Sequence, residues 1–153
     1  MRIAMGSDEG TNLTDVVIAE VEKRGHTVLR YGPLDNREAY WPEVARQAAE
    51  AVASGDADEG IFFCWTGTGI SLAANKVPGI RAALCADAET ARGARLWNKA
   101  NVLCLSLRAT SEAVALEILE VWFSIAYIPN EVDDACLAQV EDIEREYLNL
   151  KGR

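Results

Sequence analysis

The chain has 153 residues, of which half are hydrophobic and a quarter charged, as in an ordinary globular protein of one domain. Its net charge of −9 argues against nucleic acid or an anionic membrane surface as a partner, because no basic patch is present to neutralise phosphates. No apolar run approaches the roughly 20 residues of a membrane span, and the apolar start of the chain is too short for a signal peptide. We therefore expect a cytoplasmic protein.

Strands and helices are predicted to alternate along the chain. The pattern predicts, in chain order, strand 2–7, helix 12–24, strand 26–32, helix 41–55, strand 59–65, helix 69–77, strand 80–86, helix 87–98, strand 101–107, helix 110–127 and helix 133–150. This alternation indicates an α/β fold, a three-layer α/β/α Rossmann-like domain with a five-stranded parallel sheet. No linker or repeat interrupts it, so we expect one domain over 1–153, with a C-terminal helical extension at about 131–150.

Ligands of open parallel sheets bind beyond the carboxyl ends of the strands. The segments that follow the predicted strands are Ser7 to Glu9, Tyr31-Gly32, Cys64 to Gly69, Ala86-Asp87 and Leu107-Arg108. We expect these segments to meet at one edge of the sheet and to contain the functional residues.

The stretch "FFCWTGTGIS" at 62–71 combines a strand end, a glycine turn and a helix start. It lacks the lysine of a phosphate-binding P-loop, and position 72 is leucine where a dinucleotide fingerprint needs its third glycine. A turn of this kind presents backbone N–H groups that suit an anion or a developing oxyanion. Cys64 lies at its edge, where a thiolate can act as a base or a nucleophile. The alternative is that Cys64 is a buried strand residue and the glycines only form a tight turn.

The cysteines and the single histidine do not suggest a metal site. Cys64, Cys85, Cys104 and Cys136 form no C-x-x-C pair, and the only histidine is His26. Cys85 and Cys104 lie in apolar runs, where small buried hydrophobic side chains are expected. We predict no metal and no cofactor.

Three stretches are similar to a known family: "MRIAMGSDEG", "DEGIFFCWTGTGISLAANKVPGIRAALCAD" and "WNKANVLCLSLRATSEAVALEILEVWF". Together they resemble the ribose-5-phosphate isomerase B / galactose-6-phosphate isomerase (LacA/LacB) family over residues 1 to about 123. The resemblance implies a cofactor-free aldose–ketose isomerase that moves a proton between C1 and C2 through a cis-enediolate. It also implies a homodimer or a dimer of dimers, with the active site and the C-terminal helix at the subunit interface.

The resemblance also assigns roles to residues. Cys64 matches the base, Thr66 the hydroxyl that assists ring opening, and Asp8 an aspartate that binds sugar hydroxyls. The anion loop corresponds to Gly67, Thr68, Gly69, Ile70 and Ser71. Asn98 matches a substrate-binding asparagine, and Arg108 matches an arginine near the phosphate pocket of some members.

Three positions depart from the family pattern. Glu9 stands where a histidine is usual, and Trp97 replaces the histidine that serves ring opening in the family. Ring opening must then use Glu9, Asp8 or Thr66, or the substrate is already open-chain. Trp65 replaces a small residue beside the base, and either stacks on a sugar face or packs at an interface.

The C-terminal segment departs as well. Residues 131–153 carry seven acidic and three basic residues, where family members that act on sugar phosphates have phosphate-binding arginines. Negative charge there would repel a phosphate. Arg108 and Arg37 are the remaining candidate cations. We therefore expect a sugar or sugar phosphate other than ribose 5-phosphate; the alternative is a non-catalytic sugar-binding or regulatory protein with the same fold.

Overall fold

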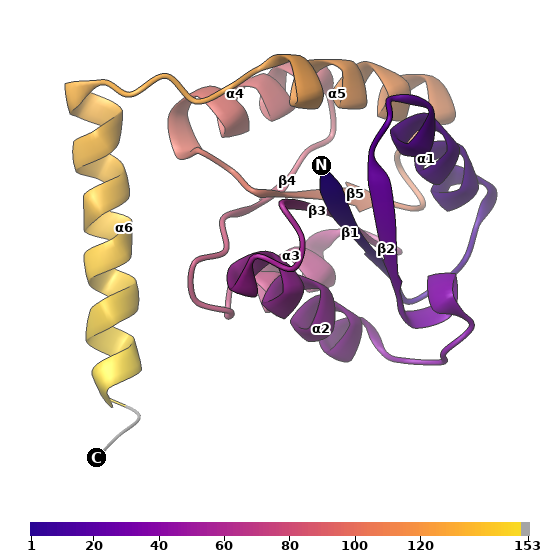
Figure 1. The fold of residues 1–153 in the computed structure, drawn as a ribbon, viewed down its shortest axis with the longest axis horizontal. Coiled ribbons are helices and arrows are strands. Elements are labelled where there is room, and N and C mark those ends of the chain that lie inside the picture. Colours follow the sequence, from indigo (N-terminus) through magenta and orange to yellow (C-terminus); the bar gives the residue numbers. More distant parts are fainter. Residues whose placement is uncertain (151–153) are drawn as a thin grey trace.

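The computed structural model describes the backbone of residues 1–150 and the side chains of residues 1–148. Strands and helices alternate as predicted (Figure 1). The elements are β1 (Arg2–Ser7), α1 (Asn12–Lys23), β2 (Thr27–Tyr31), a 3₁₀ turn (Gly32–Asp35), α2 (Trp41–Ser54), β3 (Glu59–Cys64), α3 (Thr68–Ala74), β4 (Ala82–Leu84), α4 (Ala88–Asn98), β5 (Val102–Ser106), α5 (Glu112–Ser124) and α6 (Glu131–Leu150). Within residues 1–150, no helix is both long and apolar enough to cross a membrane.

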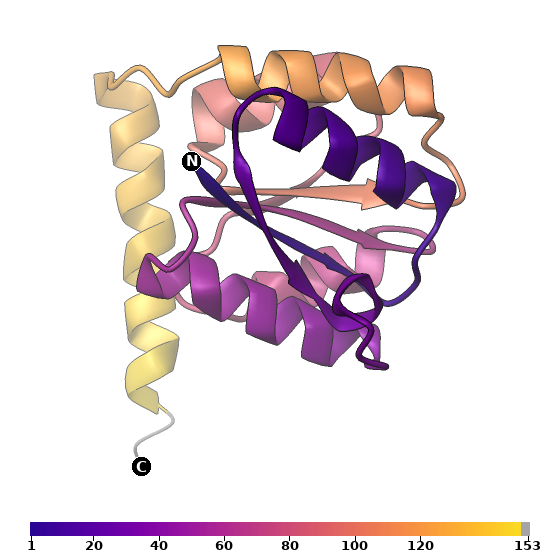
Figure 2. The same ribbon diagram turned by 45° about the vertical axis from the view of Figure 1, so that its right-hand side comes forward.

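The five strands form one parallel sheet in the order β2-β1-β3-β5-β4, which confirms the predicted fold class. Helices α1, α4 and α5 cover one face of the sheet, and α2 and α3 cover the other (Figures 1 and 2). The chain reverses its direction of winding between β1 and β3. This is where ligands of such sheets bind, at the carboxyl ends of the strands.

Successive side chains of the central strand β3 enter different cores. Ile61 and Phe63 pack with α1, α4 and α5, whereas Phe62 and Cys64 pack with α2 and α3. This alternation follows from the two-residue period of a strand, and a strand buried on both faces reads as a continuous apolar run. Cys64, the last residue of β3, is thereby aimed at the layer that contains α3.

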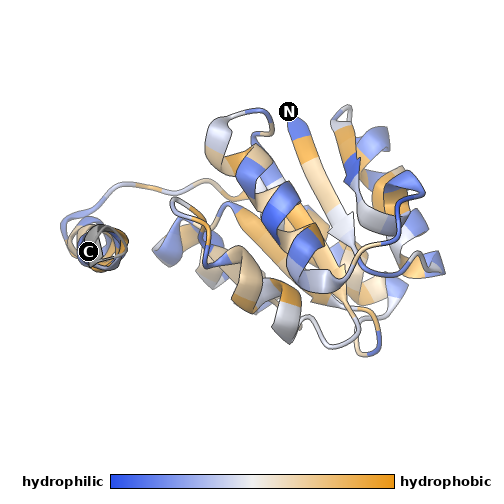
Figure 3. Cartoon of the chain, turned by 90° about the horizontal axis from the view of Figure 1, so that it is seen from below, coloured by the Kyte–Doolittle hydropathy of each residue, from blue (hydrophilic) through white to orange (hydrophobic). Residues whose placement is uncertain are grey.

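Helix α6 stands apart from the three-layer body, to which an extended linker of residues 125–130 connects it (Figures 1 and 3). A stripe of exposed side chains runs along α6: Val132, Cys136, Val140, Ile143 and Tyr147. Their spacing places them on one side of the helix. We call these five residues the α6 stripe.

Element boundaries differ from the prediction in several places, and the helix predicted at 69–77 ends at Ala74. The strand predicted at 80–86 is reduced to Ala82–Leu84 at the sheet edge, and the turn at Gly32–Asp35 was not predicted. The helix predicted to reach residue 127 ends at Ser124, because the backbone of Ile125 is extended and its carbonyl accepts a hydrogen bond from Arg95 Nε at 3.2 Å. A long-range contact thus ends this helix, which local sequence does not reveal.

Candidate active site

Three adjacent strand ends build the candidate site. Ser7 of β1 pairs in register with Phe63 of β3, and Cys64 of β3 pairs with Ser106 of β5. The segments that follow these strands therefore leave the sheet side by side. Asp8, Cys64 and Arg108, which the sequence analysis selected, belong to these three neighbouring segments.

The segment after β3 is held to the segment after β5. The Cys64 carbonyl accepts a hydrogen bond from the Leu107 N–H, and the Trp65 carbonyl accepts one from the Arg108 N–H, both at 3.0 Å. The Ser106 hydroxyl donates to the same Trp65 carbonyl at 3.0 Å. Cys64 itself is only 4% exposed. The backbone around it is thus fixed while its thiol lies just below the surface.

The turn at Gly67 requires glycine. Its φ is +76°, and a Cβ there would lie 2.5 Å from Cδ1 of Leu84 and 3.1 Å from the backbone of Leu105. Gly67 is the N-cap of α3, so the N–H groups of the first three helical residues, 68–70, have no partner within the helix. These donors stand a few residues from Cys64 and suit a negatively charged oxygen. The Ile70 side chain is buried in the core, so this residue offers only its backbone.

The side chains around this turn are polar or aromatic. The hydroxyls of Thr66 and Thr68 are hydrogen bonded to each other at 2.7 Å, which orients both at the mouth of the turn. Trp65 is 59% exposed and stands next to the buried thiol. An indole so exposed offers its ring to a ligand or to another protein surface.

The segment after β1 is shaped by a buried hydroxyl. Ser7 donates to the Glu9 carbonyl at 2.6 Å and accepts from the Glu9 N–H at 3.3 Å. This holds Asp8 half-buried at the sheet edge and leaves Glu9 exposed. Burial raises the pKa of Asp8 above its usual value, although a hydrogen bond to its own backbone opposes the shift. Asp8 therefore keeps a carboxyl group close to the strand end that holds the thiol.

Trp41 belongs to the site although the sequence analysis did not select it. A Cβ on Gly69 would lie 3.1 Å from Cδ2 and 3.3 Å from Cε2 of Trp41, so the indole lies directly against this glycine. Trp41 opens α2, which starts near the carboxyl end of β2. One feature of the sequence could have pointed to it: a tryptophan directly before a proline, at the start of a helix that begins on this edge of the sheet. Trp41 forms a wall of the glycine turn.

Two further cysteines, Cys85 and Cys104, lie in the cores. Burial raises the pKa of Cys85 to about 12 and also raises that of Cys104, so both remain thiols at neutral pH. They are the small buried side chains that the sequence predicted. Within residues 1–148, no group of three His, Cys, Asp or Glu side chains is arranged to hold a metal ion.

Two predicted site residues lie elsewhere. Trp97 and Asn98 end α4, which runs back from the carboxyl edge, so they lie at the amino edge of the sheet. The backbone carbonyl of Lys99, the next residue, accepts a hydrogen bond from Nε of Arg81, the residue before β4. The Trp97 indole folds back over Gly93 and is 61% exposed. Within one copy, the sheet therefore separates these two residues from Cys64.

The amino edge carries a large groove beneath α6. The groove has a volume of about 810 Å³, and Trp97 and Asn98 lie on its wall. Four residues of the α6 stripe line the opposite side: Cys136, Val140, Ile143 and Tyr147. Among the side chains that the structure describes, one hydrogen bond joins the body to α6, from the Gly79 N–H to Glu144 Oε1 at 2.9 Å. A mainly apolar surface is thus left open on both sides of the groove.

Comparison with known proteins gives one family. The family model described as Ribose/Galactose Isomerase matches residues 3–139. The galactose-6-phosphate isomerase subunit LacB of Clostridium acetobutylicum is 37% identical over 94% of this chain and 83% of its own length. Ribose-5-phosphate isomerase B of Escherichia coli is 38% identical over 82% of this chain and 85% of its own length.

Two further comparisons extend over nearly the full length. D-erythrulose-4-phosphate isomerase 2 of Mycolicibacterium smegmatis is 33% identical over 94% of this chain and 95% of its own length. The solved structure of ribose-5-phosphate isomerase B from Clostridium thermocellum superimposes with a TM-score of 0.89 at 40% identity, covering 96% of this chain and 99% of that one. The similarity therefore includes the body and most of α6.

Proposed function

The chain belongs to the ribose/galactose isomerase family, and we propose that it interconverts the aldose and ketose forms of a sugar phosphate by moving a proton between C1 and C2. The observation that carries this proposal is the position of Cys64, at the end of the central strand and beside the free N–H groups of residues 68–70. Abstraction of a proton next to a carbonyl needs a base and donors aimed at the oxygen that becomes charged. This edge supplies both.

In the proposed mechanism Cys64, as the thiolate, takes the proton from C2 of the open-chain aldose. The electron pair passes to the carbonyl oxygen, and the N–H groups of the glycine turn stabilise the resulting cis-enediolate. A proton then passes from O2 to O1, and return of the carbon-bound proton from the Cys64 thiol to C1 gives the ketose and regenerates the thiolate. Asp8 accepts hydrogen bonds from sugar hydroxyls, and the paired hydroxyls of Thr66 and Thr68 border the reacting carbons.

The relatives named above act on sugars that carry a phosphate, and one cation is well placed to receive such a group here. Arg108 is exposed and is tied through its backbone to Trp65, next to the base. Arg37, the other predicted cation, is paired with Asp35 at 3.3 Å. We propose Arg108 as the phosphate ligand, and we expect a substrate other than ribose 5-phosphate because the segment after residue 131 carries more acidic than basic residues and would repel a phosphate.

We also propose that two copies share each site. Trp97 and Asn98 are remote from Cys64 in one copy, yet both are exposed beside an apolar groove and the α6 stripe. An exposed apolar stripe that faces an open groove is the kind of surface that a partner can cover. A second copy docked through α6 would bring its Asn98 to the sugar bound at Cys64, and the active unit would be a homodimer or a dimer of dimers.

Replacing the thiol tests the assigned base. We expect Cys64→Ala to abolish isomerisation and to abolish exchange of the C2 proton in heavy water, followed by NMR on erythrose 4-phosphate, ribose 5-phosphate and the corresponding free sugars. Cys85→Ala, which removes a buried thiol of the core, serves as the control and retains exchange. Full activity in Cys64→Ala would refute the base. Sugar binding by the natural chain without any exchange would instead indicate a binding protein.

Mixing two inactive variants tests the shared site. Cys64→Ala and Asn98→Ala each remove a residue from a different half of the shared site. A mixture that exchanges subunits therefore restores one intact site in each mixed dimer. Random pairing then returns about a quarter of the natural activity, because half of the dimers are mixed and one of their two sites is whole. Activity that never exceeds the sum of the two separate variants would show that each copy acts alone.

A further inference from the structure

Aldoses of five or six carbons exist mainly as cyclic hemiacetals, whose C2 proton is not acidic because no carbonyl is present. An isomerase that accepts the ring must first open it. Opening transfers a proton from the anomeric hydroxyl to a base and delivers a proton to the ring oxygen from an acid. Groups whose pKa lies near the working pH perform such transfers best and contribute about 10²- to 10⁴-fold.

The site around Cys64 has few groups for this work. Cys64 itself is occupied with the carbon-bound proton, and the Thr66 hydroxyl is bonded to Thr68. Ring opening requires both an acid and a base, whereas Asp8 supplies a single carboxyl group. Its neighbour Glu9 is exposed, and the Ser7 hydroxyl fixes the Glu9 backbone. No imidazole is present in this part of the chain.

Other titratable groups of this edge are remote from the thiol. Tyr31 ends β2 and Asp87 follows β4. Each of these strands lies two positions from β3, on opposite sides of it, which corresponds to about 10 Å. Hydrogen bonds from Thr90 lower the pKa of Asp87, so it carries no proton to give at neutral pH. Burial raises the pKa of Tyr31, so it does not serve as a base there.

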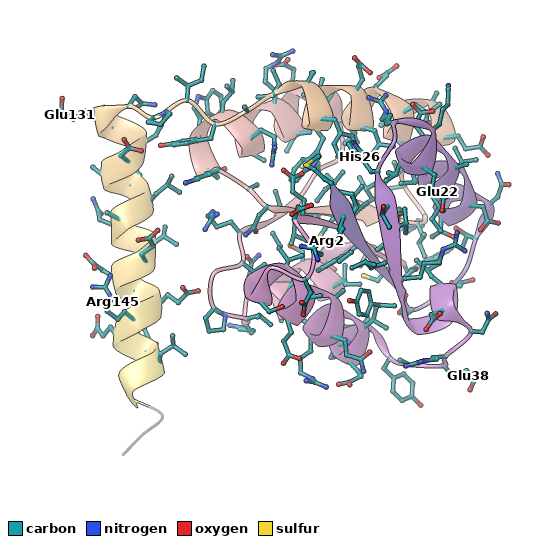
Figure 4. The ribbon with its side chains drawn as sticks, viewed as in Figure 1. Arg2, Glu22, His26, Glu38, Glu131 and Arg145 are labelled. Carbon is teal, nitrogen blue, oxygen red and sulfur yellow. The ribbon has the colours of Figure 1, made fainter. Side chains whose placement is uncertain are left out.

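The single histidine is not delivered by a second copy either. His26 lies at the amino edge before β2, 3.4 Å from the N-terminal nitrogen and stacked on Phe123 with ring centroids 4.7 Å apart (Figure 4). Trp97 and Asn98 lie beside β4, at the opposite end of the five-strand order. A partner that presents Asn98 to the sugar therefore keeps its own His26 at the far side of the sheet, with three strands between β2 and β4. The neighbour of Asn98 that it presents is the Trp97 indole, which has no proton to exchange at neutral pH.

From these positions we infer that the site works on open-chain sugars and does not catalyse ring opening. The inference rests on the proposed isomerase function and narrows its substrate class to sugars that cannot close a ring. In a tetrose 4-phosphate the phosphate occupies the oxygen that would close the ring. In a pentulose 5-phosphate the phosphate occupies the oxygen that would attack C2. Cyclic aldose phosphates enter only after they open spontaneously.

Varying the enzyme concentration distinguishes a site that accepts only open-chain sugars from one that also catalyses ring opening. D-ribose 5-phosphate and D-ribulose 5-phosphate have the same length and charge, but only the first forms a ring. As the natural protein is increased, its steady rate on ribose 5-phosphate should level off at the uncatalysed opening rate. Its rates on ribulose 5-phosphate and erythrose 4-phosphate should rise in proportion. A ribose 5-phosphate rate that stays proportional to enzyme well above the opening rate would overturn the inference.

A second measurement does not depend on turnover. Cys64→Ala leaves the rest of the site in place, so exchange between the α and β anomers of ribose 5-phosphate can be followed by NMR without isomerisation. We expect the variant to leave the exchange rate unchanged, and a tenfold acceleration would contradict the inference. Failure of the isomerase proposal is distinct, since the natural protein would then exchange no C2 proton of any of these sugars.

Discussion

Gly67 connects the proposed base Cys64 to the proposed N–H donors of residues 68–70, and its replacement tests how closely geometry and activity are linked. An alanine at this position would have to adopt the positive φ, and its Cβ would also collide with Leu84 and the β5 backbone. We expect Gly67→Ala to abolish isomerisation and to lower the free energy of unfolding by more than the about 1–2 kcal/mol that a left-handed residue costs. Gly25→Ala is the matched control, because φ is +83° there with no atom within 4 Å of a Cβ. Urea unfolding and an isomerase assay compare the two; equal losses would mean that crowding at Gly67 is relieved by movement of the turn.

Asp8, the proposed sugar ligand, lowers the stability of the fold at neutral pH. Burial raises its pKa, so the charged form is less stable in the folded chain than in the unfolded one. The resulting loss of stability is absent below the ordinary value of 3.8 and complete once pH exceeds the raised pKa. We expect Asp8→Asn to raise the melting temperature at pH 7, with a gain that shrinks as pH falls towards 3, while sugar binding weakens. Thermal unfolding from pH 3 to 7 measures this, and a lower melting temperature at pH 7 would contradict it.

Single residues were predictable from sequence where their neighbours along the chain create the chemistry. Cys64 and the glycine turn are contiguous, so a strand followed by a glycine turn was sufficient to select them. Trp41 was missed because its contact with Gly69 crosses between helices that are far apart in sequence. Trp97 and Asn98 were selected by resemblance alone, although the predicted helix 87–98 ends with them just before the next strand and so already placed them at the other edge of the sheet.

Among the elements, the end of α4 is held by a half-buried ion pair. Arg95 Nη2 lies 2.8 Å from Glu59 Oε1, with side chains 16% and 13% exposed, and the Trp122 indole N–H donates to the other carboxylate oxygen at 2.7 Å. The Arg95 guanidinium also covers the Trp122 ring at 4.8 Å. Because Arg95 bonds the Ile125 carbonyl as well, this cluster fixes both the end of α4 and the start of the linker to α6.

Arg95→Met leaves the Glu59 carboxylate without its cation in a poorly hydrated place. We expect a loss of about 3 kcal/mol in the free energy of unfolding, since breaking a buried pair costs more than the pair contributes. Arg92→Met is the control on the same helix, because its pair with Glu89 is solvent-exposed and should be worth less than about 1 kcal/mol. Chemical denaturation of both variants gives the comparison, and similar losses would mean that the cluster is well solvated.

The order of elements followed from hydrophobic pattern, because parallel strands buried on both faces stand out from amphipathic helices. The hydrophobic pattern predicted the ends of the strands and helices less accurately. The strand at Ala82–Leu84 lies at the sheet edge and pairs on one side only, so its apolar neighbours are not part of the ladder. The 3₁₀ turn after β2 depends on Gly32 at a φ of +68°, in close contact with Val44 of α2, which a reading of adjacent residues does not reveal.

For the whole molecule, the position of α6 predicts how the oligomer responds to charge. Ile143 is 58% exposed in one copy, so aspartate there costs the isolated chain little. We expect Ile143→Asp to shift the protein to a monomer in analytical ultracentrifugation and to abolish isomerisation, because the shared site is lost with the interface. Arg145→Gln changes the net charge by the same amount from the other side of the helix and should remain assembled. An active monomer would contradict the shared site.

The fold was largely predictable and the assembly was not, for one physical reason. A helix such as α6 carries the same amphipathic pattern whether it packs on its own body or on another copy, so the pattern indicates a buried face without naming its partner. The expectation that this helix lies at a dimer interface came only from the family resemblance. The open groove beneath α6 is the first observation on this chain itself that points the same way.

The four tryptophans give the protein a built-in set of optical reporters. Trp122 is fully buried, whereas Trp41, Trp65 and Trp97 are exposed to different degrees. Trp41 and Trp65 stand at the glycine turn, and Trp97 stands at the opposite edge. Emission from a variant that retains only Trp65 would report sugar binding, and one that retains only Trp97 would report subunit association, so the two events can be titrated separately, one with each variant.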